Sequence, residues 1–483
     1  MSLQTTIIKN IHNQINIVEA KNDISIIILA AGKGTRMKSS LPKVMHQVAG
    51  RPMLQIVIDE AKKINPQNIV IVISAEMQQY QNELIENNPD IKLNFALQLE
   101  RKGTGDALKT ALQFLQQQKI NIAKKILILY GDTPLLTAST MEKINNQLEA
   151  IDENNLVVLG FENQQKDYQQ SPYGRLVITN NKLLKIVEFK DANDEEKSIK
   201  LCNGGIIGIK NNKPLELLNK INNQNASQEF YLTDIVAIAN KSDIHCSFII
   251  TSPLELLGVN SKNELAEIEK IKQDQLRKKL MESGVTMLDP STIYLSCDTK
   301  IGAGSIIHQN VVIGNNVEIE EEVEIKSFSH LEGCKIKSNA IIGPFARIRP
   351  QTEIAESARI GNFVEIKNSK IQKSSKINHL SYIGDSHIGE NVNIGAGTIT
   401  CNYNGFEKFS TTIENNAFIG SNSCLVAPVN IGNNAIIGAG SVINKNVKAN
   451  SIAIARSRQE EVENGAIKFK QKYTKPNNSK KNN

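Results

Sequence analysis

A branched aliphatic residue recurs every six positions through the C-terminal half of this chain, and this period restricts the possible folds more than any other feature. The series runs from Ile301 to Ile443 with some one-residue adjustments and a longer break at 401–412, and glycine often follows directly, as at Gly302 and Gly314. A period of six fits neither an amphipathic helix nor a simple strand alternation. It is typical of a left-handed parallel β-helix of hexapeptide repeats, in which each aliphatic side chain enters the core and turns separate short strands.

The N-terminal half instead alternates short β-rich apolar runs with helical stretches. The predicted strands lie at 24–30, 69–73, 126–130 and 156–160. The predicted helices include 52–64, which has proline at its start, and 104–118. Alternating strands and helices predict a doubly wound, Rossmann-like α/β domain with a mostly parallel sheet. Ligands on such sheets bind beyond the carboxyl ends of the strands.

A linker helix is predicted between these two regions, over 261–284. Ser261 and Glu264 form a capping-box pattern, apolar residues follow at roughly helical spacing, and Gly284 marks the end. The predicted organisation is an N-terminal extension at 1–22, the α/β domain at 23–260, the linker helix, a β-helix domain at 285–457 and a basic, disordered tail at 458–483.

Composition excludes several classes of function. No apolar run approaches the roughly 20 residues that a membrane span needs, and we expect a cytoplasmic protein without membrane insertion. The six cysteines are far apart and form no Cys-x-x-Cys pair, which argues against a disulfide framework. The net charge of +6 equals the six lysines of the acid-free segment 466–483, so no basic surface remains elsewhere to predict nucleic-acid binding.

Three segments of the α/β region favour phosphate chemistry. The first strand runs into Ala31-Gly-Lys-Gly-Thr-Arg-Met37, and Lys43 follows. A glycine-rich turn lets backbone N–H groups approach a phosphate, and Arg36 and Lys43 add positive charge. A second such turn spans 98–105, and Asp132 follows the strand at 126–130. Taken singly, each segment also fits an ordinary turn or a helix cap.

The β-helix carries residues that a plain repeat does not need for stability. Arg349 and Lys367 are cations within its coils, and the interruption at 401–412 is the kind of insertion that lies on a binding face. His379 is the candidate general base, because its pKa near neutrality suits deprotonation of an amine. Zinc binding is an alternative for such β-helices, although the four histidines of this region lack a tight cluster spacing. These are His308, His330, His379 and His387.

The α/β motifs together resemble the sugar-nucleotide pyrophosphorylases. They occur in the order Leu-Ala-Ala-Gly-x-Gly-Thr-Arg-Met, Pro-Lys, Gln-x-x-x-x-Gly-Thr, Tyr-Gly-Asp, Tyr-Gly-Arg, Glu-x-Lys-Asp and Asn-x-Gly. The resemblance implies that Asp132 and Asn260 hold Mg²⁺ and that Arg36 and Lys43 act catalytically on the phosphates. It implies the following nucleotide and sugar residues: Leu29, Ala30, Ala31, Gly32, Lys43, Gln98, Gly103, Thr104, Tyr130, Gly131, Asp132, Gly174, Glu188, Asn203 and Asn260. Of these, Gln98, Gly103 and Thr104 would read uracil, and Gly174, Glu188 and Asn203 would hold the sugar.

The whole chain from residue 24 to about 456 resembles the bacterial bifunctional UDP-N-acetylglucosamine pyrophosphorylase/glucosamine-1-phosphate N-acetyltransferases. The specific motifs are Gly-Pro-Phe-Ala-Arg-x-Arg-Pro at 343–350, Gly-Asn-Phe-Val-Glu-x-Lys at 361–367 and Asn-x-Asn-Ile-Gly-Ala-Gly-Thr at 391–398. The resemblance implies His379 as the base and a sugar-phosphate site made by Arg349, Lys367, Tyr382 and Asn393. It implies an acetyl-CoA site lined by Ala396, Asn402, Tyr403, Lys408, Ser421, Ala439 and Arg456.

The resemblance further implies a homotrimer assembled through the β-helix, with Lys408 reaching across a subunit boundary. The implied reactions are acetyl transfer from acetyl-CoA to glucosamine 1-phosphate, then uridylyl transfer from UTP to N-acetylglucosamine 1-phosphate, supplying peptidoglycan and lipopolysaccharide precursors. Two alternatives remain: a β-helix that only trimerises or regulates, and a non-catalytic sugar-nucleotide sensor. The chain departs from its relatives at Gly204, where they carry a larger residue, and after Arg456, where they often have proline.

Overall fold

The computed structural model describes residues 22–151, 154–211 and 213–474, which form two compact units. One unit ends at Leu276 and the other begins at Arg277. This boundary falls within helix α9 (Lys262–Glu282), close to the predicted linker helix. Of the predicted N-terminal extension, only Asn22 is described, and it begins the first strand. The two units are therefore considered separately.

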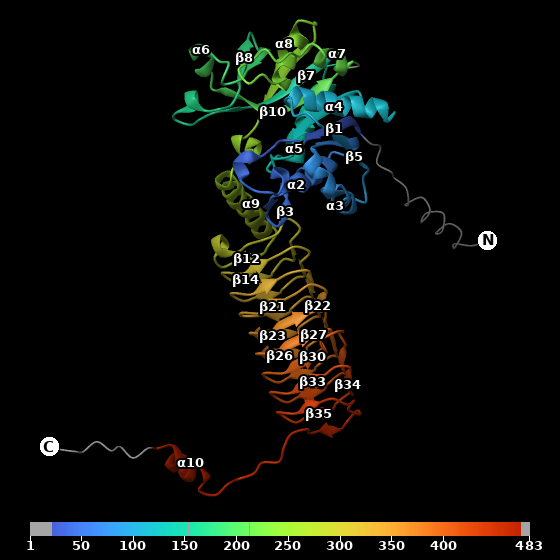
Figure 1. Ribbon diagram of the computed structural model, residues 1–483, viewed down its shortest axis with the longest axis vertical. Helices are drawn as coiled ribbons and strands as arrows, with labels where there is room; N and C mark the ends of the chain where they lie inside the picture. The colour runs from blue at the N-terminus through green and yellow to red at the C-terminus, as the bar shows by residue number, and fades with distance from the viewer. Residues whose placement is uncertain (1–21, 152–153, 212, 475–483) are drawn as a thin grey trace, which may run out of the picture. The chain divides into compact units, whose positions relative to one another are not determined.

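The first unit is built on a mixed sheet with the strand order β11-β7-β10-β6-β1-β4-β5 (Figure 1). Neighbouring strands are parallel except around β10, which runs antiparallel to β6 and β7. The strands are β1 (Asn22–Leu29), β4 (Pro66–Ile73), β5 (Leu93–Leu97), β6 (Lys125–Tyr130), β7 (Asn155–Glu162), β10 (Leu201–Lys210) and β11 (His245–Ile250). The β8–β9 hairpin (Arg175–Thr179 and Lys182–Val187) attaches to β10. The predicted α/β fold is confirmed, with each of the four predicted strands present.

Both faces of this sheet are buried because its central strands are apolar on both sides. In β1, Ile26 and Ile28 pack into one apolar cluster, whereas Ile27 and Leu29 pack into another. The helices that contribute to these clusters are α2 (Met53–Lys62), α3 (Gln81–Glu86) and α5 (Ala138–Glu149) for one cluster, and α4 (Thr104–Gln117), α7 (Pro214–Leu218) and α8 (Ile235–Asn240) for the other. The carboxyl ends of the strands are thereby held at one rigid edge.

The second unit is a β-helix of short parallel strands in three sheets, as the hexapeptide repeats predicted. Each coil visits the three sheets in turn, as in β14 (Ile306–Ile307), β15 (Val312–Ile313) and β16 (Glu318–Ile319). The strands that carry predicted site residues include β24 (Glu365–Lys367), β26 (Lys376–His379), β27 (Tyr382–Gly384) and β29 (Asn393–Ile394). Arg349 follows β21 (Arg347–Ile348), Asn402 follows β30 (Ile399–Cys401), and β23 (Arg359–Asn362) pairs with β26.

The hexapeptide register follows from packing inside the coils. The recurring aliphatic residues stack in columns, so that Ile307 pairs with Ile325 and Ile325 with Ile342, and all three are fully buried. The turns between strands place residues such as Asn310 and Asn316 in the left-handed backbone region, with φ of 58° and 57°. Asparagine tolerates this conformation better than most side chains, which explains its frequency between the strands.

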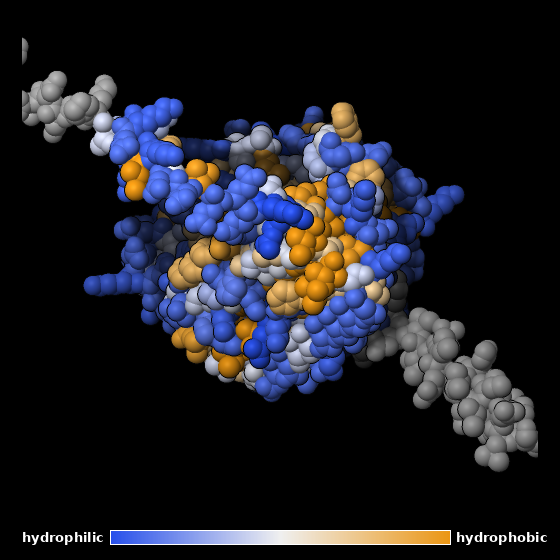
Figure 2. All heavy atoms as spheres, turned by 90° about the horizontal axis from the view of Figure 1, so that it is seen from below, coloured by the Kyte–Doolittle hydropathy of each residue, from blue (hydrophilic) through white to orange (hydrophobic). Residues whose placement is uncertain are grey.

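The structure describes part of the predicted basic tail, and its disorder stays a prediction. Within 458–474 lies helix α10 (Gly465–Tyr473), in which no residue is buried. Its lysines alternate with the apolar residues Ile467 and Phe469. Figure 2, viewed from the end where β35 (Ile436–Ile437) lies in Figure 1, shows apolar side chains gathered among polar ones. The exposed aliphatic residues of the last coils include Val442, Ile452 and Ile454.

Two further observations bear on the predicted class of protein. Among the residues described, no helix is both long and apolar enough to cross a membrane. The six cysteines, all among the described residues, form no disulfide with one another, and Cys202, Cys246 and Cys334 are buried. Burial raises the pKa of the Cys246 and Cys334 thiols to about 12, so neither is a thiolate near neutral pH.

Candidate active sites

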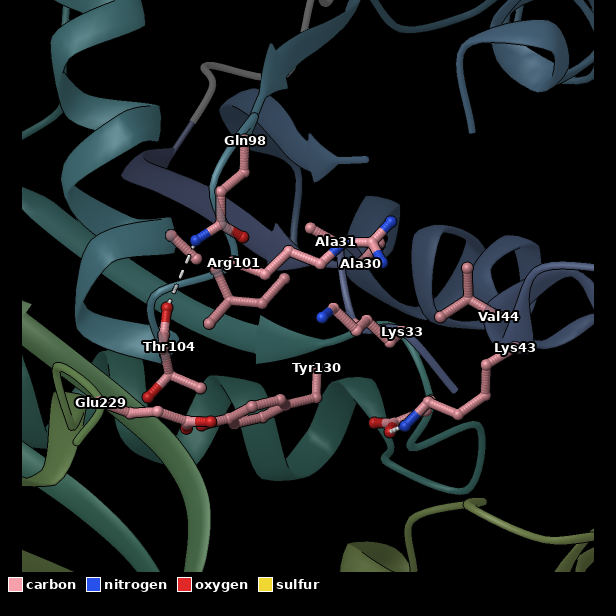
Figure 3. Close-up of a pocket in the computed structure, with 15 residues that line it drawn as sticks. Ala30, Ala31, Lys33, Lys43, Val44, Gln98, Arg101, Thr104, Tyr130 and Glu229 are labelled. Carbon is pink, nitrogen blue, oxygen red and sulfur yellow. Dashed lines mark hydrogen bonds and ion pairs between the residues drawn. The ribbon is translucent and has the colours of Figure 1, made fainter. Parts of the chain in front are cut away.

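A cavity of about 420 Å³ opens at the carboxyl ends of β1 and β6. Its lining brings together the glycine-rich turn, the 98–105 turn and the end of β6, which are far apart in the sequence (Figure 3). The predicted residues among the lining are Leu29, Ala30, Ala31, Gly32, Lys43, Gln98, Gly103, Thr104, Tyr130 and Asp132. The structure therefore places the predicted nucleotide residues around one cavity of a size suited to a small ligand.

The 98–105 turn is held tightly at the start of α4. The Gln98 side chain is buried, and its Nε2 donates to Asp106 Oδ2 at 2.8 Å and to the Gly103 carbonyl at 3.4 Å. Gly103 has φ of 121°, and an added Cβ would lie 2.6 Å from the Phe230 carbonyl oxygen, so a larger residue would not fit. Thr104 Oγ1 accepts a hydrogen bond from the Leu232 N–H at 3.1 Å. The turn is thus a preformed part of the cavity wall.

The two predicted metal ligands, Asp132 and Asn260, both contact the ammonium group of Lys43. Lys43 Nζ forms an ion pair with the Asp132 carboxylate and donates to Asn260 Oδ1 at 3.1 Å. Asn260 lies two residues before the start of α9, and its backbone N–H donates to Glu264 Oε2 at 2.6 Å, which fixes the start of the helix. A carboxylate and an amide oxygen are donors that a hard divalent cation accepts. The residues present therefore fit such a cation, and Lys43 would have to leave Asp132 when one binds.

The three predicted sugar residues also lie together. The Asn203 N–H donates to the Gly174 carbonyl at 2.8 Å, and a Cβ added at Gly174 would lie 3.3 Å from Glu188 Oε2. Glu188 Oε1 accepts from Thr233 Oγ1 at 3.0 Å. Burial raises the pKa of Glu188. Burial and, after it, the charges of Glu188 and Asp132 also raise the pKa of Tyr130. The Tyr130 side chain therefore lies near both the predicted sugar residue Glu188 and the predicted metal ligand Asp132.

The structure explains why residue 204 is glycine where the relatives carry a larger residue. A Cβ added there would lie 2.6 Å from Leu256 Cδ1 and 2.7 Å from the Leu159 carbonyl oxygen. The next residue, Gly205, has φ of 81° and packs against the Tyr130 ring. The Leu256 side chain, the Leu159 carbonyl and the Tyr130 ring therefore occupy the space that larger residues would need, which explains why residues 204 and 205 are both glycine.

The cations around the cavity differ in part from the prediction. Arg36 lies in the short 3₁₀ helix η1 (Thr35–Met37), is exposed and lies outside the cavity lining. The lining instead includes Lys33, from the same turn, and Arg101, from the second turn. Both cations were visible in the two motifs, but only the fold shows which of the turn's side chains face the cavity. The catalytic role of Arg36 stays a prediction.

In the β-helix, the predicted cations lie on neighbouring strands. The Arg349 guanidinium donates to Glu365 Oε1 at 2.7 Å, and Glu365 is paired in register with Tyr382. The close approach of Lys408, together with Arg349, lowers the pKa of Lys367. Lys408 is thus close to Lys367 within one chain, and its contribution across a subunit boundary stays a prediction. The three cations, with the carboxylates Glu365 and Asp385 near them, form a position suited to a phosphate.

His379 is the last residue of β26, and its Nδ1 lies 2.9 Å from Asn362 Oδ1. Asn393 is paired in register with Lys376, at the other end of β26. The predicted sugar-phosphate residues and the predicted base are therefore on adjacent strands of two β-helix sheets. Within the described residues, no three His, Cys, Asp or Glu side chains gather as a metal site.

The predicted acetyl-CoA residues fall into two groups. Ala396, Ser421 and Ala439 each lie two residues after a core aliphatic residue of consecutive stacked strands, so they form a column. Arg456 joins it by donating to the Ala439 carbonyl at 2.6 Å. The others belong to the insertion: Asn402 donates to the Asp385 carboxylate, and Tyr403 forms an antiparallel bridge with Lys408.

Comparison with known proteins agrees with both units. Residues 26–286 match the model of the MobA-like NTP transferase domain, and residues 333–368 and 410–445 match the bacterial transferase hexapeptide model. A bifunctional protein GlmU of Paramagnetospirillum magneticum is 43% identical over 93% of this chain and 97% of its own length. The GlmU of Zymomonas mobilis is 45% identical over 94% and 99%, and that of Wolbachia pipientis 44% over 90% and 97%.

The fold and the two sites thus define a nucleotidyltransferase domain joined to a hexapeptide-repeat transferase domain. More specifically, the chain belongs to the GlmU family of bifunctional proteins.

Proposed function

We propose that this chain synthesises UDP-N-acetylglucosamine in two steps, with acetyl transfer on the β-helix and uridylyl transfer in the α/β unit. The observation that carries the proposal is that the cations Arg349, Lys367 and Lys408 gather on the β-helix and its insertion, while the strand β26 ends in an exposed histidine, His379, that is held by Asn362. A β-helix that only trimerises has no need of a cationic group or of an oriented histidine. A non-catalytic sensor would have no need of Asp132 beside Lys43 in the other site.

In the acetyl-transfer step, the cations bind the phosphate of glucosamine 1-phosphate and orient its amine. His379 accepts a proton from the amine as the nitrogen attacks the thioester carbonyl of acetyl-CoA. The new C–N bond forms, the C–S bond breaks, and coenzyme A leaves as the thiol. Asn402, Tyr403 and the column from Ala396 to Arg456 would hold the coenzyme A.

In the uridylyl-transfer step, an oxygen of N-acetylglucosamine 1-phosphate attacks the α-phosphorus of UTP in line, and pyrophosphate leaves. Gln98, Gly103 and Thr104 would position uracil, while Gly174, Glu188 and Asn203 would position the sugar. Mg²⁺, held by Asp132 and Asn260, would neutralise charge on the phosphate oxygens. Lys43, released from Asp132, would then contact the phosphates. This step depends on positioning and charge neutralisation rather than on a covalent intermediate.

The homotrimer implied by the resemblance has a suitable surface on the β-helix. Phe328, Phe345 and Phe363 stack with ring centroids 4.9 and 5.1 Å apart, and Leu380 continues the line on the next coil. All four side chains are exposed, by 44–62%. Such a contiguous apolar line, here called the phenylalanine ladder, marks an interface. Because Leu380 follows His379, contacts on the ladder would enclose the acetyl-transfer site.

Replacing Phe345 by glutamate should therefore convert the trimer into monomers and weaken acetyl transfer, because a charge in a buried apolar interface is costly. Sedimentation velocity reports the oligomeric state, and the two activities are measured on the same sample. Ile306→Glu, on an exposed aliphatic residue outside the ladder, is the matched control. A Phe345→Glu protein that remains a trimer would show that the ladder is not the interface.

The proposed function is tested by measuring both products with one purified protein. We expect release of the coenzyme A thiol only when glucosamine 1-phosphate is present, and release of pyrophosphate only when UTP, Mg²⁺ and N-acetylglucosamine 1-phosphate are present. Pyrophosphate without thiol release would reduce the chain to a pyrophosphorylase with a scaffold. Neither product would favour the sensor. Substituting dTTP for UTP tests the nucleotide preference, and fractionation tests the cytoplasmic location that we infer.

A further inference from the structure

We propose that Asn362 is a positioning residue for acetyl transfer, because its side-chain oxygen holds His379 in the tautomer whose Nε2 can accept the proton of the amine. The proposal rests on the acetyltransferase function proposed above. Asn362 lies in the motif Gly-Asn-Phe-Val-Glu-x-Lys, which also contains Lys367.

The pairing of the two strands is extended where these residues lie. Within the described β-helix, β23 and β26 have four residues each, whereas its other strands have two or three. Their register continues from the core pair Ile360 and Ile377 to a second pair, Asn362 and His379. The additional pairing places the asparagine and histidine side chains next to each other on adjacent coils.

Glycine makes this extension possible. A Cβ added at Gly361 would lie 1.9 Å from the Asn378 carbonyl oxygen, so any other residue would push the two coils apart. Hydrogen bonds then fix both backbones: the Leu380 N–H donates to the Asn362 carbonyl at 3.0 Å, and Ser381 Oγ donates to the His379 carbonyl at 2.9 Å. The contact between Asn362 and His379 is therefore built into the coil geometry.

The chemistry of the contact determines which ring nitrogen is protonated. His379 Nδ1 lies 2.9 Å from Asn362 Oδ1, and an amide oxygen can only accept a hydrogen bond. The proton of the neutral imidazole must therefore be on Nδ1, which leaves the lone pair on Nε2 available for the amine. If the amide were reversed, Nδ2 would donate to Nδ1, and the protonated Nε2 could not act as a base.

The charged side chains of the neighbouring strands are the same in every variant used below. On β23 and β26, Arg359 and Lys376 are paired with each other in register at the start of the strands. On β24, Glu365 accepts from Arg349, and Lys367 lies beside Lys408. A difference in acetyl-transfer rate between the variants at position 362 therefore reflects the group that contacts His379 Nδ1, because these neighbouring charges do not change.

The test compares Asn362→Ala and Asn362→Asp in the full-length protein, with uridylyl transfer by the same chain as the measure of folding. In Asn362→Ala, we expect kcat for acetyl transfer to fall by about 10- to 100-fold, the usual range for loss of a group that orients a functional histidine. KM for glucosamine 1-phosphate should stay within about twofold. The matched control is Asn430→Ala, on an exposed β-helix position of β34 (Val429–Ile431).

The aspartate variant gives a readout that a purely structural residue would not affect. A carboxylate also accepts from Nδ1–H, so kcat should recover, but its charge stabilises the imidazolium and raises the pKa of His379. Since the base must be neutral, the acid limb of the pH–rate profile should move to higher pH. Wild-type kcat in Asn362→Ala, or an unshifted limb in Asn362→Asp, would overturn the inference. Acetyl transfer that is absent from the wild type, or that survives His379→Ala, would instead overturn the proposed function.

Discussion

Replacing His379 by alanine should lower the rate of acetyl transfer by roughly 10²- to 10⁴-fold, the range that general base catalysis contributes. An ammonium group cannot attack a thioester, and without the imidazole no positioned group removes the proton from the amine. The side chain is exposed and bonds only to Asn362 Oδ1 in the described structure, so the β-helix core should be unaffected. Uridylyl transfer by the same protein should keep its wild-type rate, since it uses the other unit.

The measurement is release of the coenzyme A thiol, with pyrophosphate release recorded in parallel. His387→Ala is the matched control, because His387 is an exposed histidine of β28 (Ser386–Ile388), which belongs to another sheet of the β-helix than β26. It should keep both activities. If His379→Ala lost both activities equally, the two sites would not be separate. If it kept acetyl transfer, His379 would not be the base.

The converse change, Asp132→Ala, should abolish uridylyl transfer and leave acetyl transfer intact. A bound divalent cation stabilises the transition state of phosphoryl-type transfer by several kcal/mol, so losing its only carboxylate among the predicted ligands should cost about 10²-fold or more. The change also removes the acidic partner of Lys43, which is then left with Asn260. Lys43 cannot restore the activity, because one ammonium cannot bridge several phosphate oxygens as a divalent ion does.

Pyrophosphate release measures the activity, and Mn²⁺ binding followed by electron paramagnetic resonance measures the site directly. We expect Asp132→Ala to bind Mn²⁺ more weakly than the wild type. Asp90→Ala, which removes the partner of Lys62 at an exposed pair, is the control and should change neither quantity. Unchanged Mn²⁺ binding in Asp132→Ala would place the cation elsewhere, and loss of both activities would contradict independent sites.

Much of the candidate site could be read from the sequence, because its motifs are local. The turn at 31–37, the turn at 98–105 and the strand end before Asp132 each carry their chemistry within a few residues. The doubly wound fold then requires the ends of β1 and β6 to be neighbours. Arg36 shows the limit of this reasoning, since the local motif does not reveal which cation of a turn faces the cavity.

The sequence by itself determined the β-helix, because a column of buried aliphatic residues forms only if one such residue returns to the core at a regular interval. It also determined the alternating α/β unit, because the spacing of apolar residues distinguishes the buried strands from the amphipathic helices between them. Only the tertiary structure decided that Asn362 lies against His379, that Lys408 lies beside Lys367, and that Lys43 joins Asp132 to Asn260. These contacts join residues from 17 to 217 positions apart, and they depend on strand register and side-chain direction, which periodicity does not specify.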